Sequence, residues 1–339
     1  MKAAYLVKYG PAETAFEIRE VEKPEPGPNQ VRIKVEAFGL NFADIAARYG
    51  KYRGAPPLPS LLGYDVVGQV EKCGSNVQNL IIGDRVTALT LFGGYAEFAI
   101  AENGVANKIP ESISSGVAVA LATQYCTAYF LSDRMTNIQE NEKVLIHAAA
   151  GGVGTALVQM ALNKKCIVYG TCSSPEKMEY LQKNGVHHPI NHRKKDFAET
   201  IRLLVGEKGL DVVFNPIGGK SLKQGYRLLG AGGRLVSYGV SSLNSKKNIF
   251  GKLQDLWQFG IYHPVQFLSN SKGIIGVNML KIAEEKPEKI AHVMQEVIQL
   301  QQAGILRPYV GGEYSIDQLA EAHAFLESRK SMGKIVVRW

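Results

Sequence analysis

Short apolar runs alternate with helix-length segments in the second half of the chain, and this alternation restricts the fold most strongly. The runs are KVLIHA, CIVYGTC, DVVFNP, GRLVSYG and KGIIGV, and segments such as PEKMEYLQKNG and DFAETIRLLVGEKG separate them. Strands that alternate with helices form a parallel sheet through right-handed crossovers. We therefore predict an α/β fold with a doubly wound parallel sheet in this half.

Residues 1–122 follow a different pattern. Strand-like runs such as KAAYLV, VRIKVEAFGL and YDVVGQVEKCG are broken by Gly and Pro, which predicts a β-rich, barrel-like domain. After a helix expected over 288–303, the tail ends in the strand GKIVVRW. We expect the tail to return to the first domain. The barrel domain would then comprise residues 1–123 and 307–339, and the doubly wound domain residues 124–306.

Composition narrows the class of protein. No run approaches the roughly eighteen apolar residues of a membrane span, and the N-terminal segment lacks the apolar core of a signal peptide, so we expect a cytoplasmic protein. The four cysteines form neither a disulfide framework nor a C-x-x-C zinc site. The net charge of +8 arises from 39 basic and 31 acidic residues that are interleaved, which favours an anionic cofactor over nucleic acid.

The stretch HAAAGGVG, from His147 to Gly154, joins one apolar run to an expected helix. Such a turn points backbone N–H groups and the positive end of the helix dipole at an anion, and glycines let a pyrophosphate approach the backbone. The spacing A-x-G-G-x-G departs from G-x-G-x-x-G, and a tight turn without a ligand is the alternative. The further strand and helix units favour a bound dinucleotide.

The end of the next run, YGTCSSPEK, indicates which dinucleotide binds. An acidic residue here would hold the ribose 2′-hydroxyl of NAD(H), but the first carboxylate is that of Glu176. Ser173, Ser174 and Lys177 instead suit a 2′-phosphate, because a lysine binds phosphate as a point charge. A solvated helix lysine is the alternative for Lys177. We predict NADP(H).

Motifs along the whole chain resemble the zinc-free quinone oxidoreductases of the medium-chain dehydrogenase/reductase superfamily. They are GLNFADIAARYGKY, LLGYDVVGQVEKCGSNV with GDRV, HAAAGGVG, GTCSSPEK, HPINHRKKD, and NPIGG with GGRLVSYG. HPINH and NPIGG are most similar to the vesicle amine transport protein-like branch. The resemblance implies a GroES-like β-barrel catalytic domain plus a Rossmann doubly wound parallel sheet domain. It implies NADPH as cofactor and hydride transfer to quinones or α,β-unsaturated carbonyl compounds.

The resemblance also implies a set of cofactor contacts. The glycine turn would hold the pyrophosphate, the serines and lysine the 2′-phosphate, and the strand ends the rest of the cofactor. His192 either supports the 2′-phosphate or packs beside it, with Arg193 as a nearby substitute. The residues expected to bind NADPH are Asn41, Thr127, Gly151, Gly152, Val153, Ser173, Ser174, Lys177, His192, Asn215, Tyr238 and Gly239.

Zinc-using relatives carry a Cys and a Gly-His-Glu element as metal ligands. The matching positions here are Asn41 and Gly63-Tyr64-Asp65. Zinc favours thiolate and imidazole ligands, so we expect no metal site. Hydrogen bonds must then stabilise the oxyanion of the acceptor, which favours activated acceptors over simple alcohols.

The expected hydrogen-bond donors in the first domain are Asn41, Tyr52 and Tyr64, with Asp44 as an orienting group. Each donor has a structural alternative: Asn41 as the cap of a turn, Tyr52 as a surface residue and Tyr64 as a core aromatic. As a whole, the chain is predicted to be a zinc-independent NADPH:quinone oxidoreductase or enone reductase. The alternative is a non-catalytic NADPH-binding protein of trafficking or regulatory type.

Two segments indicate further partners. KGIIGV is expected to leave an open sheet edge, which favours a homodimer. The segment NSKKNIFGKLQDLWQFG places Phe250 and Trp257 on one apolar helix face. Burial of that face is the favoured interpretation, and docking on a membrane surface through the flanking lysines is the alternative.

Overall fold

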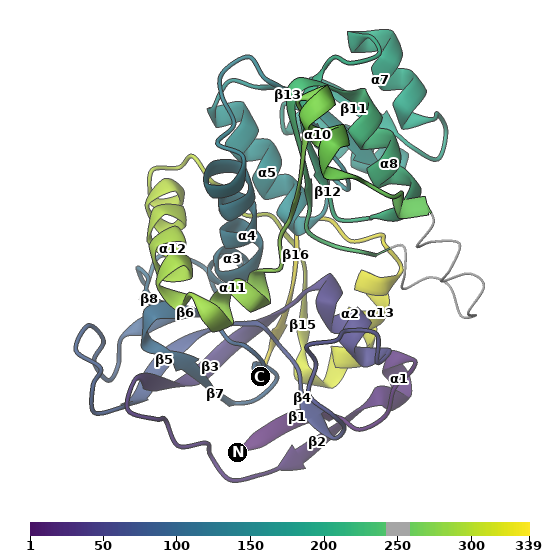
Figure 1. Ribbon diagram of the computed structural model, residues 1–339. Helices are drawn as coiled ribbons and strands as arrows, with labels where there is room; N and C mark the ends of the chain where they lie inside the picture. The colour runs from purple at the N-terminus through teal and green to yellow at the C-terminus, as the bar shows by residue number, and fades with distance from the viewer. Residues whose placement is uncertain (242–257) are drawn as a thin grey trace. The chain divides into compact units, whose positions relative to one another are not determined.

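The computed structural model of the chain describes residues 1–241 and 258–339 (Figure 1). The chain forms two compact units, the first made of Met1–Thr127 and Met279–Trp339 and the second of Ala128–Asn278. The second unit therefore interrupts the first along the chain, as the order of strands and helices predicts. The apolar face expected around Phe250 and Trp257 lies outside the described residues.

The second boundary differs from the prediction, which placed residues 279–306 with the doubly wound domain. Helices α11 (Met279–Glu285) and α12 (Pro287–Gln302) belong to the first unit. Ile290 of α12 is buried in an apolar cluster with Val105 of the first unit. Because periodicity identifies a helix but not the core against which it packs, the sequence alone could not place this boundary.

The first unit contains a seven-stranded sheet in which the path β15-β16-β3-β5-β6-β8 is joined by β7 alongside β3, and a small sheet of order β2-β1-β4. Strand β16 pairs antiparallel with β3, so that Val336 lies opposite Gly39 and the tail of the chain completes the sheet. The strands are β1 (Lys2–Leu6), β2 (Phe16–Glu20), β3 (Gln30–Leu40), β4 (Ser60–Leu61), β5 (Asp65–Cys73), β6 (Arg85–Leu89), β7 (Phe98–Glu102), β8 (Ala106–Lys108), β15 (Val310–Ser315) and β16 (Lys334–Arg338).

Short helices connect these strands. Asn41 caps α2, because the Asn41 side chain accepts from the backbone of Asp44 while the Asp44 carboxylate accepts from the Asn41 N–H at 2.7 Å. The helical segments are α1 (Ala12–Ala15), α2 (Phe42–Arg48), η1 (Asn103–Val105), α3 (Ser115–Ala120), η2 (Leu121–Tyr125), α4 (Cys126–Tyr129), η4 (Ile316–Gln318) and α13 (Leu319–Glu327), besides α11 and α12.

The second unit is built on a six-stranded sheet of order β11-β10-β9-β12-β13-β14. Every pairing in it is parallel, so the predicted α/β class and doubly wound sheet are confirmed. The elements are η3 (Phe130–Met135), β9 (Lys143–Ile146), α5 (Gly152–Asn163), β10 (Ile167–Cys172), α6 (Pro175–Lys183), β11 (His188–Asn191), α7 (Phe197–Val205), β12 (Leu210–Asn215), α8 (Gly219–Leu228), β13 (Leu229–Ser237), α10 (Pro264–Asn270) and β14 (Gly273–Gly276).

Two features of this sheet go beyond the sequence pattern. Strand β11 was not among the predicted runs, because HPIN is short, contains a proline and has only one aliphatic residue. Strand β14 ends the sheet within the described part of the chain, and the homodimer expected through this edge stays a prediction. None of the helices that the structure describes has the length and apolar character needed to span a bilayer.

Candidate functional site

The carboxyl ends of the parallel strands form one row in the second unit. Ile146 of β9 lies beside Gly170 of β10 and Phe214 of β12. On the outer sides, Cys172 pairs with Asn191 and Asn215 pairs with Ser237. The strand order reverses around β9, and open α/β sheets bind ligands beyond the carboxyl ends at such a point.

The glycine turn joins β9 to α5 at this edge. A Cβ at Gly154 would overlap the Ala148 carbonyl oxygen and lie 2.7 Å from Ala149 Cα, so this glycine is required for the helix to pack on the turn. At Gly151 a Cβ would meet only the Ala148 oxygen, at 3.2 Å. Gly151 is also the N-cap of α5, and Gly152 is its first residue. The turn therefore presents a helix N-terminus with little side-chain cover, which fits a phosphate group.

Cationic and hydroxyl groups gather at the ends of β10 and β11. Ser174 caps α6 by accepting from the Lys177 N–H at 3.3 Å, and the His192 N–H donates to the Cys172 carbonyl at 3.0 Å. Burial lowers the pKa of Lys177, and the positive charge of Arg193 lowers this pKa further. Lys177 therefore lies one helical turn from Ser174 and within electrostatic range of Arg193, an arrangement that fits a bound anion.

His147 is a residue of this edge that the sequence prediction missed. The buried Nδ1 lies 3.2 Å from the Thr171 hydroxyl, and the ring stacks edge-on against Phe197. Burial lowers the pKa of His147 to about 3, and the charge of His192 contributes. His147 is therefore neutral at pH 7 and links the glycine turn to β10. Its position directly before the alanines was the only available signal.

Asn215, which is expected to contact the cofactor, is the last residue of β12. Its Oδ1 accepts from the N–H groups of Ile217 and Gly218, both at 2.8 Å, and its Nδ2 donates to the Ser221 hydroxyl at 3.0 Å. The buried side chain is thus used in shaping the turn after β12. Tyr238 and Gly239 follow β13, and the Tyr238 N–H donates to the Asn215 carbonyl at 3.2 Å.

Thr127 lies in the first unit, in α4, directly after the π-helical segment η2. Such wide turns often occur at functional sites. The Thr123 hydroxyl and the Gln124 Oε1 of η2 are buried and have no hydrogen-bond partner among the described residues. These polar atoms fit a polar ligand group such as a carboxamide.

A buried polar network surrounds Asn41 in the first unit. The Lys334 ammonium donates to Asn41 Oδ1 at 3.0 Å and forms an ion pair with Asp65. Asn41 Nδ2 donates to Asp65 at 3.2 Å and 3.3 Å. Lys334, Asp65 and Asp44 have no exposed surface, whereas Asn41 is 9% exposed. The network therefore reaches the surface of the unit only through Asn41, among these four residues.

Tyr64 and Tyr52 lie near this network. Their rings meet edge-on at 6.1 Å, and Tyr64 also packs against Phe92. Burial raises the pKa of Tyr64 strongly and that of Tyr52 to a lesser extent, and the charge of Asp44 contributes to both. The Tyr64 hydroxyl is buried and lies close enough to the Tyr52 hydroxyl for a hydrogen bond between the two phenols to affect both pKa values. Both phenols therefore stay protonated and can donate.

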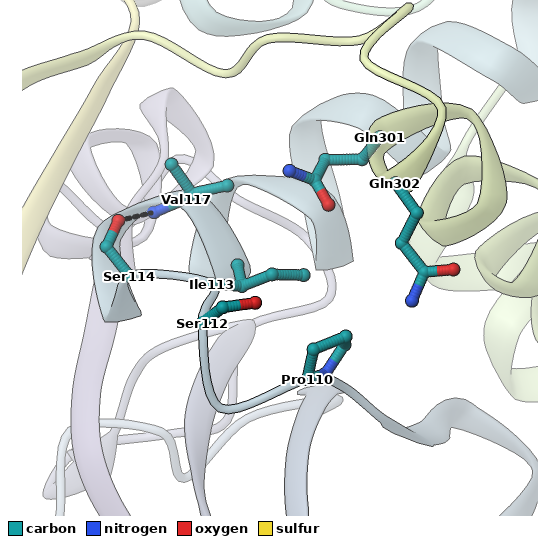
Figure 2. Close-up of a pocket in the computed structure, with 7 residues that line it drawn as sticks. All are labelled: Pro110, Ser112, Ile113, Ser114, Val117, Gln301 and Gln302. Carbon is teal, nitrogen blue, oxygen red and sulfur yellow. Dashed lines mark hydrogen bonds between the residues drawn. The ribbon is translucent and has the colours of Figure 1, made fainter.

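A hollow of about 440 Å³ opens elsewhere in the first unit, between the segment before α3 and the end of α12 (Figure 2). Figure 2 shows no charged side chain in its lining, so it does not suit a dinucleotide phosphate. None of the predicted site residues contributes to it. Its lining residues are Pro110, Ser112, Ile113, Ser114, Val117, Gln301 and Gln302.

Comparison with known proteins identifies the family. Residues 27–111 match the alcohol dehydrogenase GroES-like domain, and residues 152–296 match the zinc-binding dehydrogenase family. The human synaptic vesicle membrane protein VAT-1 homolog is 33% identical over 94% of this chain and 81% of its own length. Human quinone oxidoreductase is 30% identical over 99% of this chain and 97% of its own length.

The chain belongs to the medium-chain dehydrogenase/reductase superfamily. A solved structure of this superfamily, Escherichia coli quinone oxidoreductase complexed with NADPH, superposes with a TM-score of 0.87 at 26% identity and covers all of both chains. The predicted GroES-like and Rossmann architecture and the predicted relationship to quinone oxidoreductases are thereby confirmed. The glycine turn and the serine and lysine edge fit the phosphates of a dinucleotide.

Zinc does not fit this chain at the positions that match the zinc ligands of zinc-using relatives. The Lys334 ammonium already holds the oxygens of Asn41 and Asp65, and a second cation would have to displace it. Neither Asn41 nor Tyr64 offers the thiolate or imidazole that zinc favours. Within residues 1–241 and 258–339, no group of three or more His, Cys, Asp or Glu side chains is arranged to hold a metal ion.

The buried Asp44 side chain should give the free energy of unfolding an unusual dependence on pH. Burial raises the pKa of Asp44 from its usual 3.8 to about 7, so the folded protein binds this proton more tightly than the unfolded chain. The free energy of unfolding therefore falls as the pH rises from about 4 to about 7 and falls no further above that range. Asp44→Asn removes this loss. Between about pH 4 and about pH 7, the free energy of unfolding of the variant should rise relative to that of the wild type by up to about 1.4 kcal/mol per pH unit.

Urea denaturation at several pH values between about 4 and about 8 measures this difference. Asp196→Asn is the matched control, because backbone N–H donors at the start of α7 lower the pKa of Asp196 and remove it from the window. Parallel stability curves for Asp44→Asn and the wild type would contradict the buried, proton-binding carboxyl.

Proposed function

We propose that this protein is an NADPH-dependent oxidoreductase that reduces quinones or α,β-unsaturated carbonyl compounds without a metal ion. The observation that carries the proposal is the carboxyl edge of the Rossmann sheet. There the glycine turn is accompanied by Ser173, Ser174 and Lys177, and the first acidic residue after β10 is Glu176, already inside α6. The relationship to quinone oxidoreductases, one of them solved with NADPH, supports the same cofactor and acceptor class.

The hydrogen-bond donors of the first unit favour an activated acceptor, such as a quinone or an enone. When bound, NADPH supplies a hydride, so that one quinone or enone and one proton give the reduced acceptor and NADP⁺. Negative charge develops on the acceptor oxygen, and preorganised neutral donors such as Asn41, Tyr52 and Tyr64 stabilise it. An unactivated alcohol would need the stronger polarisation that a metal provides. The Lys334 ammonium on Asn41 and Asp65 argues against such a metal.

Absorbance at the NADPH band, followed with a panel of quinones and enones, tests this function. We expect turnover of at least one acceptor, with kcat/KM at least about tenfold higher for NADPH than for NADH, as one charged phosphate contact contributes. Tight NADPH binding by fluorescence without turnover of any acceptor would contradict the proposal. That result would favour the non-catalytic binding protein.

Lys177→Ala should weaken NADPH selectively. Loss of a charged contact to the 2′-phosphate is expected to raise the dissociation constant of NADPH about tenfold or more and to leave that of NADH unchanged. Lys183→Ala is the matched control, since Lys183 lies on the same helix α6 and is 73% exposed. Equal effects of Lys177→Ala on both nucleotides would remove Lys177 from the 2′-phosphate site.

Tyr64→Phe separates a substrate contact from core packing. The lost hydroxyl can bond only to the neighbouring Tyr52 phenol, so the free energy of unfolding should change by no more than about 1 kcal/mol. If the Tyr64 hydroxyl donates to the acceptor oxygen, its removal should nevertheless lower kcat by roughly tenfold or more. Tyr226→Phe deletes a similarly buried, unpartnered hydroxyl in the second unit and should leave kcat unchanged. Unchanged kinetics of Tyr64→Phe would identify Tyr64 as a core aromatic only.

A further inference from the structure

Lys334 is a buried cation at the first position of β16. It lies 293 residues after Asn41 along the chain, yet its ammonium donates to Asn41 Oδ1 at 3.0 Å and pairs with Asp65. Neither the lysine nor the aspartate side chain has any exposed surface. Burying two charges is costly and is weak evidence of a gain in stability, so a role beyond stability must be considered for this pair.

The fold provides dedicated space for this side chain. Gly39 lies on β3 opposite Val336 of β16, and a Cβ at Gly39 would overlap both Cε and Nζ of Lys334. It would also lie 2.5 Å from Val119 Cγ1. Because Gly39 has no side chain, the end of the Lys334 side chain can occupy this space and reach Asn41.

The two buried charges fix the orientation of the Asn41 amide. Its oxygen faces the Lys334 ammonium, and its nitrogen faces the Asp65 carboxylate. A flipped amide would place its N–H donors against the ammonium and its oxygen against the carboxylate, and both contacts would be repulsive. Only one amide orientation is therefore compatible with the ion pair.

The same arrangement leaves Asn41 able to donate to a ligand. Its Nδ2 lies 3.2 Å and 3.3 Å from the two Asp65 oxygens, so one N–H directed between them serves both, and the second N–H is the one from which a ligand would accept. Asn41 is 9% exposed, whereas Lys334 and Asp65 are fully buried. A cation on the amide oxygen also polarises the amide and strengthens its remaining N–H as a donor.

We propose that Lys334 is a positioning residue, which with Asp65 holds the Asn41 amide in the one orientation that donates a hydrogen bond to the oxygen of the acceptor. This role rests on the proposed reductase function. Lys334 is not one of the positions that match the zinc ligands of zinc-using relatives. The ammonium instead provides a fixed cation for the oxygens of Asn41 and Asp65.

A kinetic cycle tests whether Lys334 acts through Asn41. Lys334→Met/Asp65→Asn removes the ion pair without leaving an unpaired charge, and Lys334→Gln/Asp65→Asn is the second variant if the first does not fold. We expect either double variant to lower kcat at least tenfold and to change the dissociation constant for NADPH no more than Asn41→Ala does. Adding Asn41→Ala to the double variant should change kcat by less than about twofold, since the amide is already misplaced.

The control removes a partly buried ion pair of the second unit. Arg234 and Glu142 of the second unit form two hydrogen bonds of 2.8 Å. Arg234→Met/Glu142→Gln should lower stability but not kcat. Two outcomes would overturn the positioning role. One is that the kcat losses of Asn41→Ala and of the Lys334 and Asp65 double variant multiply when they are combined. The other is that the double variant alone keeps a kcat within twofold of the wild type.

An activity-independent measurement separates this proposal from the reductase function. In ¹H–¹⁵N spectra, assigned by the loss of one signal pair in Asn41→Ala, one Asn41 side-chain proton of the wild type should exchange at least tenfold more slowly than the other. This protection should disappear in the double variant. Fast, equal exchange of both protons in the wild type would overturn the proposal. If the wild type reduces no acceptor, the reductase function fails, and the exchange measurement alone decides whether Lys334 fixes the amide.

Discussion

The ion pair between Lys334 and Asp65 is the interaction on which the polar centre of the first unit depends. It joins the last strand of the chain to β5, and both side chains are fully buried. Asn41 bonds to both partners, and its backbone N–H bonds to Asp44. Since an unpaired charge in this position would be very costly, the polar centre is complete only when the tail of the chain is in place.

Each unit carries groups that the proposed function uses. In the second unit the parallel register aligns the strand ends, and glycine, serine and lysine residues there fit phosphate groups. In the first unit one neutral donor, Asn41, is held by the buried charges of Lys334 and Asp65, an arrangement suited to stabilising an oxyanion without reorganisation. The proposed function follows from combining a cofactor edge with a donor centre, and neither alone would indicate a reductase.

The sequence predicts what depends on local pattern. The strands of the Rossmann sheet and the glycine turn follow from apolar periodicity and from Gly154, which permits close packing. Strand β11 is not predicted, because most of its residues have little β-propensity. It forms a strand because it pairs with β10. Asn215 is expected at the cofactor, and the structure adds that its side chain also orders the turn that follows β12. Lys334 could not be found at all, because its partner depends on the register of β16 with β3.

A double-mutant cycle on stability tests the central claim most directly. The free energy of unfolding would be measured by urea denaturation for the wild type, Lys334→Met, Asp65→Asn and the double variant. We predict that each single variant loses roughly 3–5 kcal/mol, because it leaves one buried charge unpaired, and that the double variant loses far less than the sum. Additive losses would show that the two charges do not depend on each other, and would contradict the view that this pair organises the first unit.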